Sequence, residues 1–247
     1  MKKLMIILLL ACVYTALYSQ DSVRLHGQVT DFNGIAIDSV TIRLKNKNFE
    51  NLYETVTDKN GNYSLTVLKN SYYCFYAIRL VDYAKTKLEY WAWNIPAFHD
   101  LEINPKYERM EVYIMNAFEP QVSPHETYMV YFRPMSLTKS HKFEGKRSIK
   151  EVERTASAEK SLMDIAPEAI TAEELTVHIN GLESEVVGIN KIKEYARGAY
   201  LYGYLIQIKK PEDINSHHSD YDQISIQLHS KETDEYGMGE CFVKKNK

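Results

Sequence analysis

Apolar residues alternate with polar ones along most of this 247-residue chain, and this pattern constrains the fold more than any other feature. The longest stretch carries Tyr200, Tyr202, Tyr204, Ile206 and Ile208 at every second position. Side chains two residues apart on an extended strand point to the same face, so this spacing indicates strands with one buried face. Five shorter stretches repeat it, at residues 40–44, 63–67, 112–114, 175–179 and 224–228.

Turn signals separate these stretches. The dipeptides Asn33-Gly34, Asn60-Gly61 and Asn180-Gly181 suit tight hairpins, and residues 213–222 form a polar connection. Short strands at this spacing favour antiparallel sandwiches over a parallel sheet with crossover helices. The predicted fold class is therefore mainly β.

One segment departs from the alternation. Residues 148–163 carry apolar residues at helical spacing among alternating charges, which predicts an amphipathic helix. Two prolines, Pro120 and Pro124, mark the expected domain boundary because proline interrupts both sheet pairing and helix. We therefore expect two antiparallel β-sandwich domains, at residues 21–120 and 125–247, with the one amphipathic helix inserted in the second.

The first 20 residues read as a signal peptide. Lys2 and Lys3 precede an apolar run that ends near Ser19, the arrangement of a secretory leader. Cleavage after Ser19 would release a soluble chain, whereas cleavage before Cys12, in a sequence like a bacterial lipoprotein box, would leave a lipid anchor. The chain is expected to be exported to the periplasm, the cell surface or the medium, with a membrane attachment only if it is lipidated at Cys12.

Two segments share a turn pattern of aspartate, asparagine and glycine: Gly27-Gln-Val-Thr-Asp-Phe-Asn-Gly34 with its continuation to Ile42, and Thr57-Asp-Lys-Asn-Gly61 with its continuation to Leu65. Together they resemble the carboxypeptidase regulatory-like family. The resemblance implies a seven-stranded transthyretin-like sandwich for residues 21–120, in an exported bacterial protein, and we expect an immunoglobulin-like sandwich to follow it. The chain departs from the family at Ala36, where proline is common, and at Ser39, where glycine is common. Such modules accompany peptidases, transporters and surface proteins, so the resemblance implies no activity.

No residue pattern in the chain predicts catalysis, a metal or a cofactor. The formal charge of −3 lacks the basic footprint of a nucleic-acid-binding protein. His99 and Glu102 match a zinc-binding pair, but no third ligand can be placed. Residues 58–62 fit a hairpin turn better than a calcium loop, and residues 217–222, with two histidines and two aspartates, fit an exposed loop. The sequence leaves open whether Cys74 and Cys241 form a disulfide.

The aromatic segment between Tyr72 and Phe98 holds both tryptophans of the protein. On a strand, Trp91 and Trp93 project from one face about 7 Å apart. If that face is exposed, the two indoles and Tyr90 make a platform for sugar rings or for a protein partner. If it is buried, the same residues fill a core or an interface between domains.

These patterns predict a non-enzymatic accessory protein of the bacterial cell envelope. The first hypothesis is that it binds a polysaccharide or another envelope protein through Tyr90, Trp91 and Trp93. The alternative is a structural or assembly component of an envelope complex, with no small ligand. The two hypotheses differ in whether the tryptophans are exposed.

Overall fold

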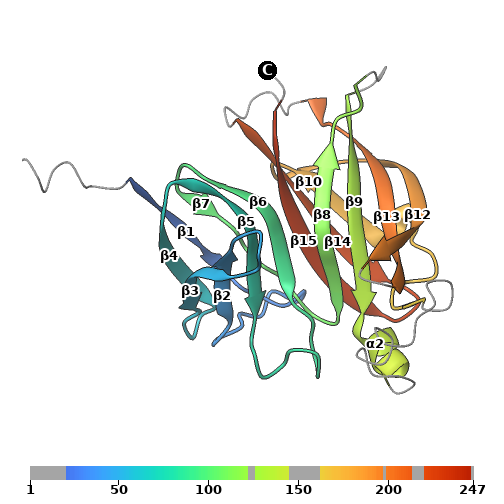
Figure 1. Cartoon of the computed structure of the whole chain (residues 1–247), viewed down its shortest axis with the longest axis horizontal. Helices are drawn as coiled ribbons and strands as arrows, with labels where there is room; N and C mark the ends of the chain where they lie inside the picture. Colours follow the sequence, from blue (N-terminus) through green and yellow to red (C-terminus); the bar gives the residue numbers. More distant parts are fainter. Residues whose placement is uncertain (1–20, 122–125, 145–161, 197–198, 213–219, 246–247) are drawn as a thin grey trace, which may run out of the picture.

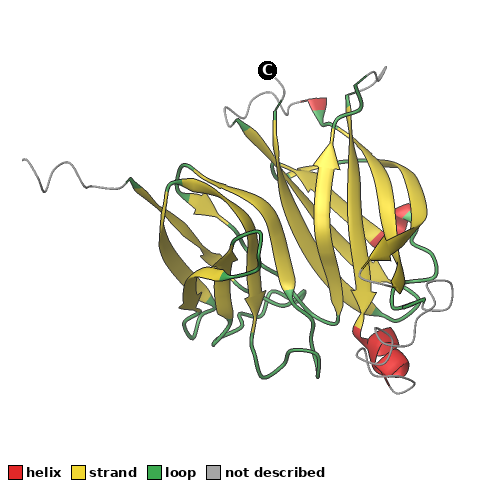
Figure 2. Ribbon diagram, viewed as in Figure 1, coloured by secondary structure: helices red, strands yellow, loops and turns green. Residues whose placement is uncertain are grey.

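The computed structural model describes residues 21–121, 126–144, 162–196, 199–212 and 220–245. Strands make up most of it, and they form three sheets in which most neighbouring strands are antiparallel (Figure 2). The mainly β fold with sandwich architecture is therefore confirmed. The predicted leader at residues 1–20 lies outside the described residues.

The N-terminal half is a sandwich of two facing sheets. The smaller sheet has the strand order β4-β1-β7. Its strands are β1 (Ser22–Gln28), β4 (Asn62–Leu68) and β7 (Leu101–Glu102). The facing strands are β2 (Thr41–Lys45), β3 (Asn51–Val56), β5 (Asn70–Ile78) and β6 (Tyr90–Ala97). Alternate residues of β4 are buried between these sheets, as the period of two predicted.

The C-terminal half is a second sandwich. One sheet has the order β12-β13-β9-β8. Its strands are β8 (Met110–Phe118), β9 (Thr127–Ser136), β12 (Val186–Ala196) and β13 (Ala199–Lys209). The strands that face it are β10 (Leu175–Ile179), β11 (Leu182–Glu183), β14 (Tyr221–Ser230) and β15 (Glu235–Lys244).

A single eight-stranded sheet runs through both halves, in the order β11-β10-β14-β15-β6-β5-β2-β3. Its two parts meet where β15 pairs in parallel with β6, with Gly239 opposite Trp91 and Cys241 opposite Trp93 (Figure 1). β8, which precedes the expected boundary at Pro120, pairs with β9 in the second sandwich. Hydrogen bonding therefore crosses the expected boundary, and the independence of residues 21–120 stays a prediction.

All three expected hairpin turns are present. Asn180 and Gly181, with φ of 53° and 80°, connect β10 to β11. The Asp31 side chain accepts hydrogen bonds from the backbone N–H groups of Asn33 and Ile35, at 2.9 and 2.8 Å. The Asp58 side chain likewise accepts hydrogen bonds from the backbone N–H groups of Asn60 and Asn62, at 2.9 and 2.8 Å. Gly34 and Gly61 have φ of 80° and 73°, a conformation that favours glycine.

The described helix lies elsewhere than the sequence predicts. α2 (Leu137–Glu144) directly follows β9, and its first turn is held by Glu235, whose carboxylate accepts a hydrogen bond from Thr138 N–H at 3.0 Å. Residues 145–161, most of the predicted helix, lie outside the described residues, and its last residue, Met163, bonds to the Tyr200 carbonyl as part of an extended segment. None of the described helices is long and apolar enough to cross a membrane.

Candidate functional site: an aromatic junction and the cleft beside it

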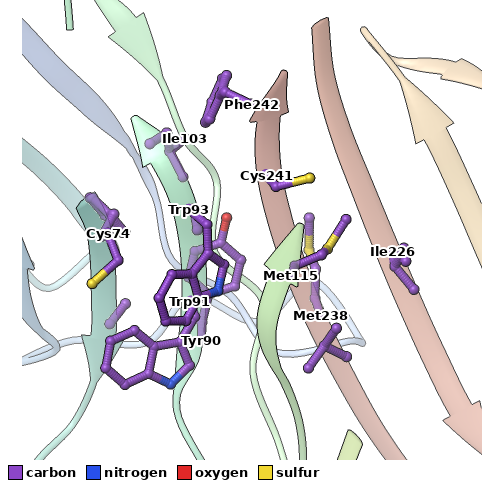
Figure 3. Packing of buried hydrophobic residues seen from close by; sticks show 14 of the residues in the cluster. Cys74, Tyr90, Trp91, Trp93, Ile103, Met115, Ile226, Met238, Cys241 and Phe242 are labelled. Atoms are coloured by element: carbon purple, nitrogen blue, oxygen red, sulfur yellow. The ribbon is translucent and has the colours of Figure 1, made fainter. Parts of the chain in front are cut away.

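Trp91 and Trp93 lie on one face of β6, as their spacing predicts. Their rings stack, with centroids 5.5 Å apart and planes 21° from parallel. Figure 3 shows the two indoles along β6, with Cys74 on one side and Cys241 on the other. Tyr113 of β8 packs edge-on against both indoles, at 5.4 and 5.2 Å, so a strand of the second sandwich covers the tryptophans of the first.

Rings from the first sandwich complete this enclosure. Phe49, in the connection between β2 and β3, contacts both indoles, Tyr73 contacts Trp93, and Tyr76 contacts Trp91 with centroids 4.9 Å apart. We call Phe49, Tyr73, Tyr76, Trp91, Trp93 and Tyr113 the aromatic junction.

The sequence leaves open whether this aromatic face is exposed or buried, and the structure has it buried. Trp91 is 6% exposed and Trp93 is 3% exposed, because the aromatic junction encloses both. Tyr90 points to the opposite face of β6, where it packs against Phe75 and is fully buried. Binding through these three residues would require the aromatic junction to open. The alternative hypothesis needs no such change, because it expects these residues to be buried in a core or an interface.

Three buried glutamates border the strands of this junction. Burial raises the pKa of Glu89, just before β6, to about 7, and burial together with the nearby Glu89 charge raises the pKa of Glu111 on β8. Burial also raises the pKa of Glu240 on β15 to about 7, although its carboxylate accepts a hydrogen bond from the Gln223 side chain at 2.7 Å. Burial in the β6–β8–β15 contact therefore makes all three carboxyl groups weaker acids than an exposed glutamate.

A cleft opens beside the aromatic junction, at the end of the β6–β15 contact. β6 and β15 pair only through residues 91–93 and 239–241, and each continues beyond that point. Figure 1 shows the two halves separating toward the end of the molecule that carries the C-terminus. The cleft has a volume of about 620 Å³, within the usual range of roughly 300–1,000 Å³ for ligand pockets.

Each wall of the cleft comes from one sandwich. The first wall contains Pro96, Phe98, His99, Asp100 and Leu101, and the second contains Asn180, Asp220, Tyr221, Gln223, Phe242 and Lys244. Phe98 and Tyr221 stack across it, with ring centroids 6.3 Å apart and planes 23° from parallel. Phe98 is 38% exposed, which makes it the accessible member of the aromatic segment in this cleft.

The zinc-like pair predicted from the sequence is split by the fold. His99 lines the cleft, whereas Glu102 on β7 lies with His26 in a separate groove over the smaller sheet. Among the described residues, no three histidine, cysteine, aspartate or glutamate side chains lie close enough to hold a metal ion.

The polar segment at residues 217–222 and the two cysteines do not form a metal site among the described residues. His217 and His218 lie outside the described residues, and Asp222 is 2% exposed and accepts hydrogen bonds from Tyr128 and Asn180, each at 2.7 Å. Cys74 and Cys241 are buried free thiols, and burial raises the pKa of Cys74 to about 12.

The cleft is the feature that sequence reasoning missed. Phe98 and Tyr221 come from segments far apart in the chain, and neither belongs to a recognisable motif. The parallel β6–β15 pairing brings them together, and no local pattern predicts that pairing. The one available signal was the aromatic segment, of which Phe98 is the last residue.

Comparison with known proteins identifies no family for this chain. No protein-family model and no curated protein matches the chain. Among solved structures it resembles the major pilin subunit BcpA of Bacillus cereus, with a TM-score of 0.27 and 14% identity over 91% of this chain and 69% of that one. It also resembles the full-length major pilin SpaD of Corynebacterium diphtheriae, with a TM-score of 0.21 and 10% identity over 91% of this chain and 65% of that one. Scores this low leave the function to be argued from the chain's own contacts.

Proposed function

We propose that this chain is an exported, non-enzymatic structural component of the bacterial cell envelope, which assembles there with other proteins. The observation that carries the proposal is the eight-stranded sheet that continues from one sandwich into the other. Independent binding modules are usually joined by a linker across which few contacts form. Here the backbone pairing of β6 with β15 and the aromatic junction fasten the two sandwiches into one stiff body.

The burial of the tryptophans supports this function over recognition through Tyr90, Trp91 and Trp93. Two stacked indoles covered by Tyr113 contribute packing energy to the contact between the sandwiches. Aromatic pairs add about 0.5–1.5 kcal/mol each beyond the apolar area that they bury. This packing energy helps to keep the two sandwiches in one fixed arrangement, which a spacer or an assembly component requires.

We further propose that residues 21–120 contain a transthyretin-like module of the carboxypeptidase regulatory-like family. Seven strands, β1 to β7, form two facing sheets before β8 leaves for the second sandwich. The turns at Asp31 and Asp58, which carry the sequence resemblance, are formed by the hydrogen bonds that the motif requires. A sequence profile built from homologues of this chain tests the assignment, since members of that family would conserve Gly34 and Gly61.

Cross-linking on intact cells tests the structural function. With lysine-reactive reagents, the native protein is expected to join covalently to itself or to a second envelope protein. In parallel, purified residues 21–247 should show blue tryptophan emission that iodide does not quench, because Trp91 and Trp93 are the only tryptophans. A protein that gives no cross-linked product at its native abundance, or whose indoles are quenched freely, would contradict the proposal.

A further inference from the structure

The cleft between Pro96–Leu101 and β14–β15 has the makeup of a binding site, and it is separate from the structural contact just described. Its apolar lining comes from Phe242, which is 5% exposed, and from Leu101 and Pro96. Polar side chains line both walls as well. A ligand that fits must present both an apolar surface and many hydrogen-bonding groups.

The polar wall is held in position before any ligand arrives. The Asn180 side chain donates to Asp222 at 2.7 Å and accepts from the backbone N–H of Gln223 at 2.9 Å. The Gln223 side chain is in turn fixed by its hydrogen bond to Glu240. A preorganised wall lowers the entropy that binding must overcome.

The charges around the cleft balance one another, which favours a neutral ligand. Asp100 accepts a hydrogen bond from the backbone N–H of Arg24 at 2.8 Å and lies 3.6 Å from its guanidinium group. Asp220 and Lys244 contribute one charge of each sign to the opposite wall. Among the described residues, neither His99 nor Lys244 has a hydrogen bond or ion pair from its side chain, so both are available as donors to ligand hydroxyl groups.

An extended peptide fits this cleft less well, although it lies at a strand edge. A peptide that adds to a sheet needs backbone donors and acceptors on the strand that it joins. Pro96 has no N–H, and its carbonyl already accepts a hydrogen bond from Phe98 N–H at 2.8 Å. The β6 wall is therefore protected against strand addition.

From these observations we infer that the cleft binds a neutral saccharide, with the Phe98 ring, which is 38% exposed, as the stacking surface. A pyranose ring has an apolar C–H face, which packs on an aromatic ring, and a rim of hydroxyl groups, which His99, Asp100 and Lys244 reach from the walls.

Calorimetric titration of residues 21–247 tests this inference. The panel contains neutral oligosaccharides of glucose, mannose, galactose and N-acetylglucosamine, an oligoglucuronate as a charged ligand, and a mixture of extended apolar peptides. One neutral series is expected to bind. Phe98→Ala should weaken that binding about tenfold, and Phe98→Tyr, which keeps the ring, should restore most of it.

Phe118→Ala is the matched control, because Phe118 is an exposed phenylalanine, 51% accessible, outside the cleft lining. It should leave binding unchanged. All three variants should melt within a few degrees of the parent, since none removes a buried side chain. The inference is overturned if no neutral saccharide binds, if Phe98→Ala binds as well as the parent, or if a peptide or oligoglucuronate is the ligand that Phe98→Ala weakens.

Discussion

Glu240 shows how a single residue can make the stability of this protein depend on pH. Its side chain is 3% exposed on β15 and accepts a hydrogen bond from the Gln223 side chain. Burial holds its pKa at about 7, above the usual value near 4.5. In the unfolded chain the carboxyl ionises near its ordinary pKa, whereas the folded chain keeps the proton until about pH 7. Raising the pH from about 5 to about 7 therefore lowers the free energy of unfolding progressively.

Glu240→Gln should remove this effect. The amide is neutral and has the same shape, so at pH 8 the variant should be more stable than the parent, by about 1–3 kcal/mol, whereas at pH 5 the two should melt together. Thermal melts at the two pH values measure the difference. Glu235→Gln is the matched control: Glu235 is buried but ion-paired to Arg109 at 3.2 Å, so its loss should destabilise the protein at both pH values. An equal effect of Glu240→Gln at pH 5 and pH 8 would contradict the pKa argument.

At the scale of elements, the close packing of β8 on β15 explains how the second sandwich contacts the tryptophans of the first. β15 carries Gly237 and Gly239 where β8 approaches, and a Cβ built on Gly239 would lie 2.6 Å from the Val112 carbonyl oxygen. No side chain fits at that distance, so glycine permits the close contact that lets Tyr113 reach Trp91 and Trp93.

Gly239→Ala should therefore separate β8 from β15. We expect a loss of about 1–3 kcal/mol of unfolding free energy, the usual cost of overpacking, together with greater iodide quenching of the indoles. Denaturant titration followed by tryptophan fluorescence measures both. Gly188→Ala on β12 is the control, because its added Cβ would meet nothing nearer than 3.6 Å and should change neither quantity. Equal behaviour of the two variants would show that the β8–β15 approach is not tight.

The elements that sequence predicts well are those with one buried face. Tyr63, Leu65 and Val67 alternate with polar residues and form β4, and the pattern at residues 224–228 falls in β14. β15 has no such alternation, because β8 covers one of its faces and Glu240 and Cys241 are both buried. Trp91 and Trp93 lie on one face of a strand, as their spacing predicts, but their exposure depends on β8, which the local sequence does not specify. The cleft depends in the same way on the β6–β15 pairing.

At the scale of the whole molecule, the shared sheet determines how the chain unfolds. β6 is hydrogen-bonded to β5 on one side and to β15 on the other, and β8 covers the tryptophans that β6 carries. Unfolding of the second sandwich would therefore expose the aromatic junction and one edge of β6 at once. Such coupling favours a single cooperative transition over two.

Comparison of residues 21–247 with residues 21–120 decides whether the boundary at Pro120 separates two domains. The longer chain should unfold in one transition, with tryptophan emission and far-UV circular dichroism changing together. The fragment keeps β8 but loses its partner β9, and it also loses β15, so its indoles should emit at longer wavelength and be quenched by iodide. The uncovered apolar surface and the free β6 edge should make it self-associate. A monomeric fragment with blue emission and the melting temperature of one phase of the full chain would instead establish two independent domains, and the stiffness on which the structural function depends would be lost.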